Sequence, residues 1–320
     1  MRTRLSLHAP AKVNLGLRVV GKRADGYHLL DTTFHALDLH DTLVLDDAAE
    51  FAFEVVGDGG GLPVPADDDN LVVSAARAFF AAAGVSPRGR FQLTKRIPAG
   101  GGLGGGSSDA AAALLLLQHR HGQPLAVADL LALAVRLGAD VPFFLLAGTA
   151  RGQGIGEQLT PMPPPTARHF VLVVPPFGTS TAAVFKNYRP ELTQGPVPAK
   201  SPQGNPGSTK GLRVSSGLST QPWHNDLAVS AEQLYPDLAH LRGTMVEAGF
   251  ASASMSGSGS TLFLAFTQPD PAAQAHARLQ GLVGATARVL LTRTADGMVA
   301  SRIPIAEEEA PNPASSGQGG

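Results

Sequence analysis

The sequence of 320 residues contains no cysteine, which excludes disulfides, a thiolate nucleophile and metal sites with cysteine ligands. It also lacks a strong net charge. The 25 basic and 26 acidic residues leave a formal charge of −1, so no basic footprint for nucleic acid stands out. Lysine is scarce, with six among the 25 basic residues, so a lysine within an apolar strand is informative here.

Long apolar runs are absent as well. The longest, Ala110–Leu117, falls far short of the roughly 20 residues that a transmembrane helix needs. Residues Met1–His8 alternate like a strand and lack the apolar core of a signal peptide. We therefore expect a cytoplasmic protein that binds neither a membrane nor nucleic acid.

The composition and length predict a soluble globular protein with one large or two ordinary domains. Four prolines between Pro161 and Pro165 indicate a boundary, which gives an N-terminal domain over 1–160 and a C-terminal domain over 161–305. Residues 193–221 are rich in Pro, Gly, Ser and Gln without apolar periodicity, and are predicted to be a flexible insertion. Residues 306–320 are predicted to be a disordered tail.

Apolar periodicity places strands and helices along both domains. Strands are predicted over 4–9, 12–20, 42–45, 51–56, 91–97, 170–174, 261–267 and 287–292. Helices are predicted over 71–83, from Ser107 or Ser108 to about 122, and over 128–137, 181–187, 227–248 and 271–282. The strands 42–45 and 51–56 are expected to belong to a meander. Because strands and helices do not alternate strictly, the pattern favours an α+β fold.

The motif richest in glycine is Pro98–Ala110, which holds six glycines and two serines in front of an alanine- and leucine-rich run. Glycines allow positive φ angles that turn backbone N–H groups into a concave nest. With Ser107 or Ser108 as the expected N-cap, the nest would open onto a helix N-terminus, which favours an anion such as phosphate. A flexible loop before an ordinary helix is the alternative.

Three familiar phosphate motifs do not fit this loop. The spacing of Gly100, Gly102 and Gly105 matches a dinucleotide fingerprint, but the acidic residue about 20 positions onward is missing. A Walker A loop would need its own lysine, and the loop has none. The protein-kinase sequences Asp-Phe-Gly and His-Arg-Asp are also absent.

Three other features have both a structural and a functional interpretation. Lys12 and Asn14 fall on one face of the strand 12–20, about 6–7 Å apart, and Lys12 could simply be solvated. Asp140, two residues before Pro142, could be the N-cap of a short helix. The small-residue loop Ser254–Ser260 could be a tight turn or a second phosphate contact.

Read together, these segments resemble the GHMP kinase superfamily over roughly residues 5–292. The matching blocks are Ala9–Leu17, Gly21–His28, Pro98–Ala110, Gly138–Phe143 and Ser256–Gly259, with Asn70-Leu71, Phe185-Lys186 and Asn225–Leu227 in the expected order. The glycine loop by itself indicates only the superfamily. The sequences Ala-Asp-Gly-Tyr-His and Gly-Ala-Asp-Val-Pro narrow the resemblance to the branch that acts on cytidine diphosphate-linked methylerythritol in isoprenoid biosynthesis.

The resemblance implies a two-domain fold and a reaction. The N-terminal domain would resemble ribosomal protein S5 domain 2, and the C-terminal domain would be ferredoxin-like. ATP, accompanied by Mg²⁺, would donate its γ-phosphoryl group to the C2 hydroxyl of the small-molecule acceptor in the cleft between the domains. Homoserine kinase or mevalonate kinase activity stays open as an alternative, and so does a GHMP-fold protein that binds nucleotide without catalysis.

The resemblance also implies roles for individual residues. Asp140 would be the base toward the hydroxyl, with Lys12 beside it as the catalytic cation. Tyr27 and Phe185 would sandwich the cytosine ring, His28 would read its polar edge, and Asn14 would also contact the acceptor. For Phe185 a place in the core is the alternative, and for Tyr27 and His28 the start of a strand. ATP would be bound by Pro98, Gly100, Gly101, Gly102, Leu103, Gly104, Gly105, Gly106, Ser107 and Ser108, with Asn70 and Lys95 near adenine.

Overall fold

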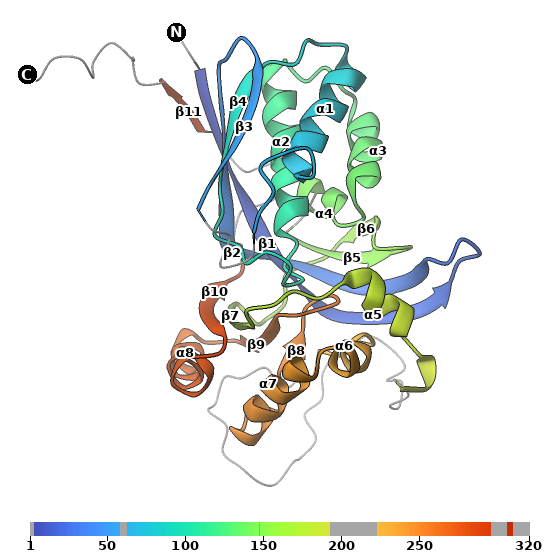
Figure 1. Ribbon diagram of the computed structural model, residues 1–320, viewed down its shortest axis with the longest axis vertical. Coiled ribbons are helices and arrows are strands. Elements are labelled where there is room, and N and C mark those ends of the chain that lie inside the picture. The colour runs from blue at the N-terminus through green and yellow to red at the C-terminus, as the bar shows by residue number, and fades with distance from the viewer. Residues whose placement is uncertain (1–2, 58–62, 147, 193–222, 296–305, 310–320) are drawn as a thin grey trace, which may run out of the picture.

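The computed structural model describes residues 3–57, 63–146, 148–192, 223–295 and 306–309 (Figure 1). Two β-sheets form its framework. The strands are β1 (Thr3–Lys22), β2 (His28–Asp46), β3 (Phe51–Val56), β4 (Gly89–Thr94), β5 (Thr149–Gln153), β6 (Gln158–Pro161), β7 (His169–Val174), β8 (Ser254–Met255), β9 (Leu262–Phe266), β10 (Arg288–Arg293) and β11 (Ala306–Glu309).

Helices cover both sheets, and most begin or end within a few residues of the predicted bounds. They are α1 (Leu71–Ala83), α2 (Gly105–Arg120), α3 (Val127–Leu137), α4 (Val141–Leu146), α5 (Thr181–Asn187), α6 (Ala228–Leu234), α7 (Pro236–Glu247) and α8 (Pro269–Val283), with a 3₁₀ turn over Pro190–Leu192. The single helix predicted over 227–248 is wrong, because Pro236 has no N–H for a continuing helix and starts α7 instead. The α+β class is confirmed.

The first sheet has the strand order β11-β1-β2-β4-β3, with β5 paired to β2 and β6 paired to β5. β2 is long enough for two partners on the same side, since residues 32–35 pair with β5 and residues 42–46 pair with β4. The predicted meander is wrong, because β3 pairs with β4 in parallel and not with β2. Helix α1 makes that parallel connection possible by carrying the chain back across the sheet.

The ribbon formed by β1 and β2 is interrupted by bulges that decide which side chains face the site. The pairing register shifts between Asn14 and Leu17, where Gly16 has a φ of +89°. The bulge breaks the expected alternation: Leu17 lines the same cavity as Lys12 and Asn14, whereas Val13 packs in the core behind them. Strict alternation over residues 12–20 predicts that Val13 and Leu17 lie on one face of the strand, opposite Lys12 and Asn14. The bulge makes that prediction wrong.

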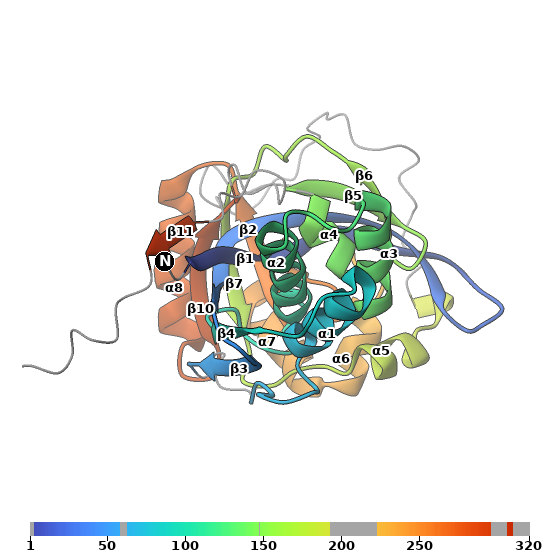
Figure 2. The same cartoon turned by 90° about the horizontal axis from the view of Figure 1, so that it is seen from above.

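Helix α2 lies at the centre of the N-terminal half, between the β1–β2 ribbon and helices α1, α3 and α4 (Figure 2). Residues Ala110–Leu114 are all buried, which explains why this stretch of small and apolar side chains has no polar face. The N-terminus of α2 thereby points toward the lower half of the molecule (Figure 1).

The second sheet has the order β10-β7-β9-β8 and carries α8 and the α6–α7 pair on its outer face. Alternate residues of β7 divide between two cores. Phe170 and Leu172 pack against the first sheet together with Val13, whereas Val171 and Val173 pack under the helices. The two sheets therefore share one apolar layer, and the site described below lies at its edge.

The C-terminal part of the chain differs from the prediction at one place. Residues Ala306–Glu309, expected in a disordered tail, form strand β11 against β1. The free edge of β1 offers unpaired backbone groups, which such a short segment satisfies. The rest of that tail and the predicted insertion 193–221 lie outside the described residues. Within the described ranges, no helix combines the length and apolar character needed to cross a bilayer.

Candidate active site

A cavity of about 1060 Å³ lies between the glycine loop, the β1–β2 ribbon and helix α5. Every residue that the sequence analysis assigned to catalysis, ATP or the acceptor lines it, except Ser108. Ser108 is buried in the first turn of α2, and its hydroxyl has no hydrogen-bond partner among the described residues. Residues as far apart in the sequence as Lys12 and Ser258 thus line the same cavity.

The glycine loop forms a concave backbone turn. Gly100, Gly102 and Gly104 have φ angles of +68°, +74° and +72°, which side-chain-bearing residues rarely adopt. Alternating positive and negative φ turns successive N–H groups inward, and the first N–H groups of α2 continue this surface. The predicted serine cap is wrong. Helix α2 begins at Gly105, so its N-cap is Gly104. A Cβ at position 104 would lie 2.9 Å from Phe144 and 3.0 Å from Lys12, which leaves room for glycine only.

The second glycine loop supports the first. Thr261 N donates to Gly101 O at 3.1 Å, and Ser256 Oγ donates to Gly102 O at 2.9 Å. A Cβ on Gly102 would lie 2.7 Å from Gly259 O, so the two loops touch through bare backbone. The glycine loop is therefore held in place by residues from the C-terminal half of the chain.

The Lys12 ammonium lies at the mouth of this loop. Lys12 N donates to Leu103 O at 2.9 Å, which fastens strand β1 to the loop. Lys12 Nζ lies 3.4 Å from Asp140 Oδ2 and donates to Asn14 Oδ1 at 2.8 Å. The Lys12 side chain is 4% exposed and that of Asp140 32%, so the cation is buried while the carboxylate faces the cavity.

Asp140 owes its position to the turn between α3 and α4. Gly138 N donates to Ala134 O at 3.2 Å and ends α3, and Val141 N donates to Gly138 O at 3.1 Å before α4 begins. This turn directs the Asp140 carboxylate toward Lys12. The two residues are 128 positions apart in the chain, so local sequence patterns alone could not predict that they lie side by side.

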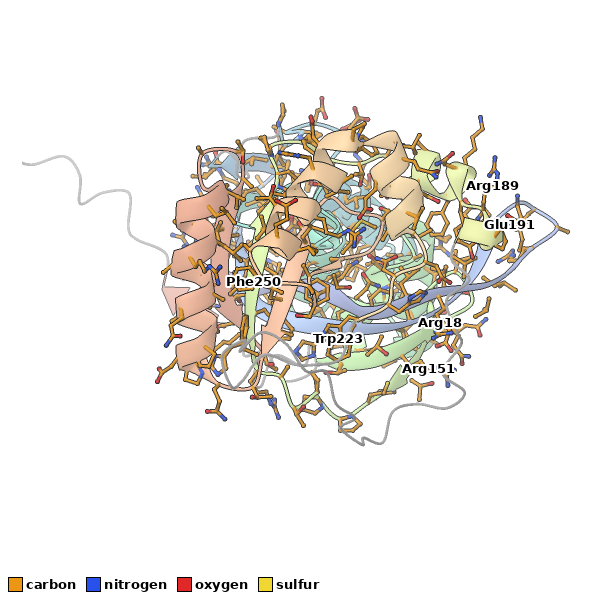
Figure 3. All side chains as sticks on the ribbon, turned by 90° about the horizontal axis from the view of Figure 1, so that it is seen from below. Arg18, Arg151, Arg189, Glu191, Trp223 and Phe250 are labelled. Atoms are coloured by element: carbon orange, nitrogen blue, oxygen red, sulfur yellow. The ribbon has the colours of Figure 1, made fainter. Side chains whose placement is uncertain are left out.

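Aromatic rings form the opposite end of the cavity. The rings of His28 and Phe185 stack with centroids 5.3 Å apart, and Tyr188 meets His28 edge-on at 5.7 Å. Burial lowers the pKa of His28, and the charge of Lys22 lowers it further. Tyr27 is 60% exposed at the rim. Helix α5 lies beside the outer part of the β1–β2 ribbon, and Figure 3 shows Arg189, just after it, near the tip of that ribbon.

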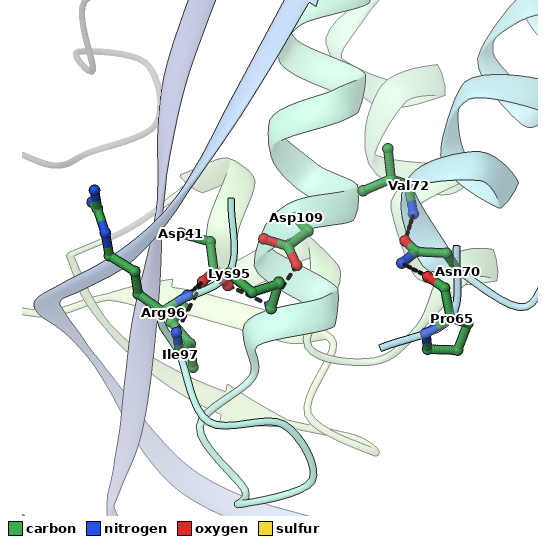
Figure 4. A network of polar contacts seen from close by, with 8 residues as sticks. All are labelled: Asp41, Pro65, Asn70, Val72, Lys95, Arg96, Ile97 and Asp109. Carbon is green, nitrogen blue, oxygen red and sulfur yellow. Dashed lines mark hydrogen bonds and ion pairs between the residues drawn. The ribbon is translucent and has the colours of Figure 1, made fainter. Parts of the chain in front are cut away.

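Asn70, predicted near adenine, has both polar ends of its side chain engaged. Its Oδ1 accepts from Val72 N at 2.9 Å and caps α1, and its Nδ2 donates to Pro65 O at 2.7 Å (Figure 4). Pro65 and Asn70 both line the cavity. The side chain therefore fixes the wall segment that precedes α1.

Lys95 lies between two buried carboxylates that the sequence analysis did not single out as a group. Its ammonium donates to Asp41 and, at 2.8 Å, to Asp109 (Figure 4). Burial alone would lower the pKa of Lys95, but the charges of Asp109 and Asp41 outweigh it and raise that pKa. Asp41 Oδ1 also accepts from Ile97 N at 2.9 Å, which orients the entry to the glycine loop.

Asp109 is the residue of this cluster with the most altered acidity. Burial raises its pKa to about 7, the Lys95 ammonium opposes that rise, and the Asp41 charge adds to it. Two carboxylates share one cation in a buried place, so the cluster favours one bound proton. Asp109 follows Ser107-Ser108 in the sequence, but no sequence pattern connects it to Asp41.

We expect Lys95→Met to destabilise the fold by about 3–5 kcal/mol, because two buried carboxylates then lose their cation. Asp109→Asn keeps the shape and leaves Lys95 with Asp41 alone, so it should cost far less. Urea unfolding of both variants at pH 7 measures this difference. Equal losses in the two variants would contradict the assigned charge balance.

The free energy of unfolding should also depend on pH because of Asp109. The folded-state pKa of Asp109, about 7, exceeds its ordinary value of 3.8. The contribution of this carboxyl to stability is therefore complete below about pH 4 and is lost as pH rises toward about 7. Asp109→Asn removes that group, so its stability should change less between pH 5 and pH 8 than that of the wild type.

Family comparisons agree on both halves of the chain. Residues 70–148 match the family described as GHMP kinases N terminal domain, and residues 215–283 match GHMP kinases C terminal. The first match spans α1, the glycine loop and the turn that carries Asp140. The second includes the loop that supports Gly102.

Full-length relatives carry a more specific name. A 4-diphosphocytidyl-2-C-methyl-D-erythritol kinase of Bordetella bronchiseptica is 40% identical over 261 residues, 81% of each chain. One of Pelotomaculum thermopropionicum is 36% identical over 288 residues, 89% of this chain and 96% of the relative. A crystal structure of 4-(cytidine 5'-diphospho)-2C-methyl-D-erythritol kinase, 35% identical, has a TM-score of 0.69 and covers 90% of this chain and 98% of that one.

Proposed function

Because this chain belongs to the GHMP kinases, and within them to the 4-diphosphocytidyl-2-C-methyl-D-erythritol kinases, we propose that it phosphorylates the C2 hydroxyl of that compound with ATP. The reaction is a step of the non-mevalonate route to isoprenoid precursors. The observation that carries the proposal is one cavity with a glycine nest, a Lys12–Asp140 pair and an aromatic end. Because ATP and the cytidyl acceptor are water-soluble metabolites, the proposed location of the reaction is the cytoplasm.

The glycine nest is the proposed site of the ATP phosphates. Backbone N–H groups from Gly100 to Ser107 and the N-terminal dipole of α2 would hold the β- and γ-phosphates without a lysine in the loop. The cavity wall near Asn70 and Pro65 would take the nucleoside. Lys95 would act there by fixing the loop entry through Asp41, since its ammonium is already engaged.

The Ser107 hydroxyl beside the nest is the proposed protein ligand for a magnesium ion that accompanies ATP. A Cβ on Gly138 would lie 4.0 Å from Ser107 Oγ, so this hydroxyl faces the turn that carries Asp140. Mg²⁺ prefers oxygen ligands and commonly takes most of them from phosphates and water. Bound with ATP, the ion would neutralise phosphate charge, and Ser107 would offer it a hydroxyl oxygen.

Asp140 and Lys12 would carry the chemistry at the acceptor hydroxyl. Phosphoryl transfer has a loose transition state, so the protein mainly positions groups and stabilises charge. The Asp140 carboxylate, open to the cavity, would accept the hydroxyl proton as the oxygen attacks phosphorus. The buried Lys12 ammonium, 3.4 Å from that carboxylate, would offset the charge of the transferred group.

The aromatic end is the proposed acceptor subsite. Phe185 already stacks on His28, so the cytosine ring would lie against this pair with Tyr27 closing from the rim. With its pKa lowered, His28 is neutral near pH 7 and can both donate and accept toward the base edge. Asn14 Nδ2 and Oδ1 are engaged within the protein, so Asn14 would act through Lys12 as well as beside the acceptor.

A coupled ADP-release assay on the purified chain tests the function. We expect turnover with Mg·ATP and the cytidyl acceptor, loss of turnover with EDTA, and none with homoserine or mevalonate. The Asp140→Asn chain, purified in parallel, controls for contaminating kinases. Turnover with homoserine or mevalonate alone would assign another GHMP kinase activity, and no turnover with any acceptor would favour a binding protein.

A further inference from the structure

A line of three hydrogen bonds extends from the Lys12 ammonium into the β1–β2 ribbon. Lys12 Nζ donates to Asn14 Oδ1, Asn14 Nδ2 donates to Thr32 Oγ1, and each distance is 2.8 Å. The Thr32 hydroxyl in turn donates to Gly16 O, also at 2.8 Å. The Lys12, Asn14 and Thr32 side chains belong to residues only 2–3% exposed, so bulk water does not compete for these bonds.

The chemistry of the two ends fixes the direction of every bond in the line. A lysine ammonium only donates and a backbone carbonyl only accepts. Thr32 must therefore give its proton to Gly16 and use a lone pair for the Asn14 amide. The amide in turn must present its oxygen, not its nitrogen, to Lys12. The orientation of the Asn14 side chain, which crystallographic density seldom distinguishes, is determined here by Thr32.

The bulge in β1 makes the terminal acceptor available. Gly16 has its φ of +89° where the register shifts between Asn14 and Leu17. At a regular position in the ladder the carbonyl would face the neighbouring strand, whereas here Gly16 O accepts from a side chain of β2. The bulge and the hydroxyl together anchor the line at the end away from Asp140.

We propose that Thr32 is a positioning residue for phosphoryl transfer: its hydroxyl locks the Asn14 amide so that Oδ1 holds the Lys12 ammonium beside Asp140. The proposal rests on the kinase function proposed above and on the role of Lys12 in it. Without the hydroxyl, the amide can rotate and turn a donor toward the ammonium. The Lys12 ammonium would then leave its position 3.4 Å from Asp140.

The test compares Thr32→Val with Thr32→Ser in steady-state kinetics. Valine keeps the β-branched shape and removes the hydroxyl, whereas serine keeps the hydroxyl. We expect kcat of the valine variant to fall about 10- to 100-fold, with little change in KM for ATP, since small displacements of catalytic groups have effects of this size. The serine variant should keep most of the wild-type kcat. A valine variant with wild-type kcat would overturn the proposal.

A second measurement separates positioning from general destabilisation. In an Asn14→Ala chain the line is already broken, so adding Thr32→Val should lower kcat no further, whereas a purely structural loss would persist. An additive loss in the double variant would overturn the proposal. Thermal unfolding of each chain shows whether it is folded at the assay temperature, and Thr32→Ala replaces valine if that chain is not. A wild-type chain without turnover would instead refute the proposed function.

Discussion

Asp140→Asn is expected to lower kcat on the order of 10²- to 10⁴-fold, the range in which general bases contribute. The amide matches the carboxylate in size but cannot accept the hydroxyl proton at neutral pH. The Asp140 side chain is 32% exposed and, among the described residues, its ion pair is with Lys12, so the fold should lose little. Coupled ADP release gives kcat, and single-turnover mixing shows whether the chemical step is the one affected.

The control for this variant is nucleotide binding. If Asp140 acts on the acceptor and not on ATP, the Kd for ATP and the thermal midpoint should stay near those of the wild type. The contrary interpretation is that Asp140 merely precedes helix α4. Under that interpretation kcat would drop by less than about tenfold, in proportion to any loss of stability.

Lys12→Met should lower kcat on the order of 10²- to 10³-fold, comparable to removing one preorganised donor in a transition state. Methionine keeps the unbranched stem that packs against Gly104 and removes only the charge. Asn14 Oδ1 is left without its donor, so a stability loss of about 1–3 kcal/mol is also expected. Measuring kcat and the urea midpoint on the same preparation separates the two effects.

A matched lysine in the same cavity provides the comparison. Lys22 also lines the cavity but is exposed and lies near His28, at the acceptor end. Lys22→Met should therefore affect KM for the acceptor more than kcat. If both lysine variants had the same small effect on kcat, the ammonium beside Asp140 would have no special part in the transfer step.

Local patterns predicted the parts of this site that are local in sequence. Gly100, Gly102 and Gly104 adopt the positive φ angles that the glycine spacing indicated, because only glycine does so at low cost. Lys12 and Asn14 share a face because the strand pairs regularly between them, and the observed hydrogen bond follows from that. The helix bounds near α1 and α5 follow from their capping residues, Asn70 and Ser180.

Features that depend on distant segments were not predictable in this way. Lys95 has its carboxylate partners 14 and 54 residues away, and nothing in the spacing distinguishes the buried Asp41 from aspartates that lie on the surface. The bulge at Gly16 reverses the side-chain alternation, which a period of two cannot anticipate. The predicted serine cap was wrong because α2 already begins at Gly105, which places Ser107 and Ser108 inside its first turn.

Gly102, part of the proposed ATP site, contacts the Ser256–Gly259 loop. The affinity for ATP should therefore depend on the contact between the two halves of the chain. A ligand that binds only the assembled state stabilises every contact which that state requires. ATP should therefore protect amides of β9 and α8 from hydrogen exchange as well as those of α2. Conversely, an inhibitor that wedges the two loops apart would block the kinase without resembling either substrate.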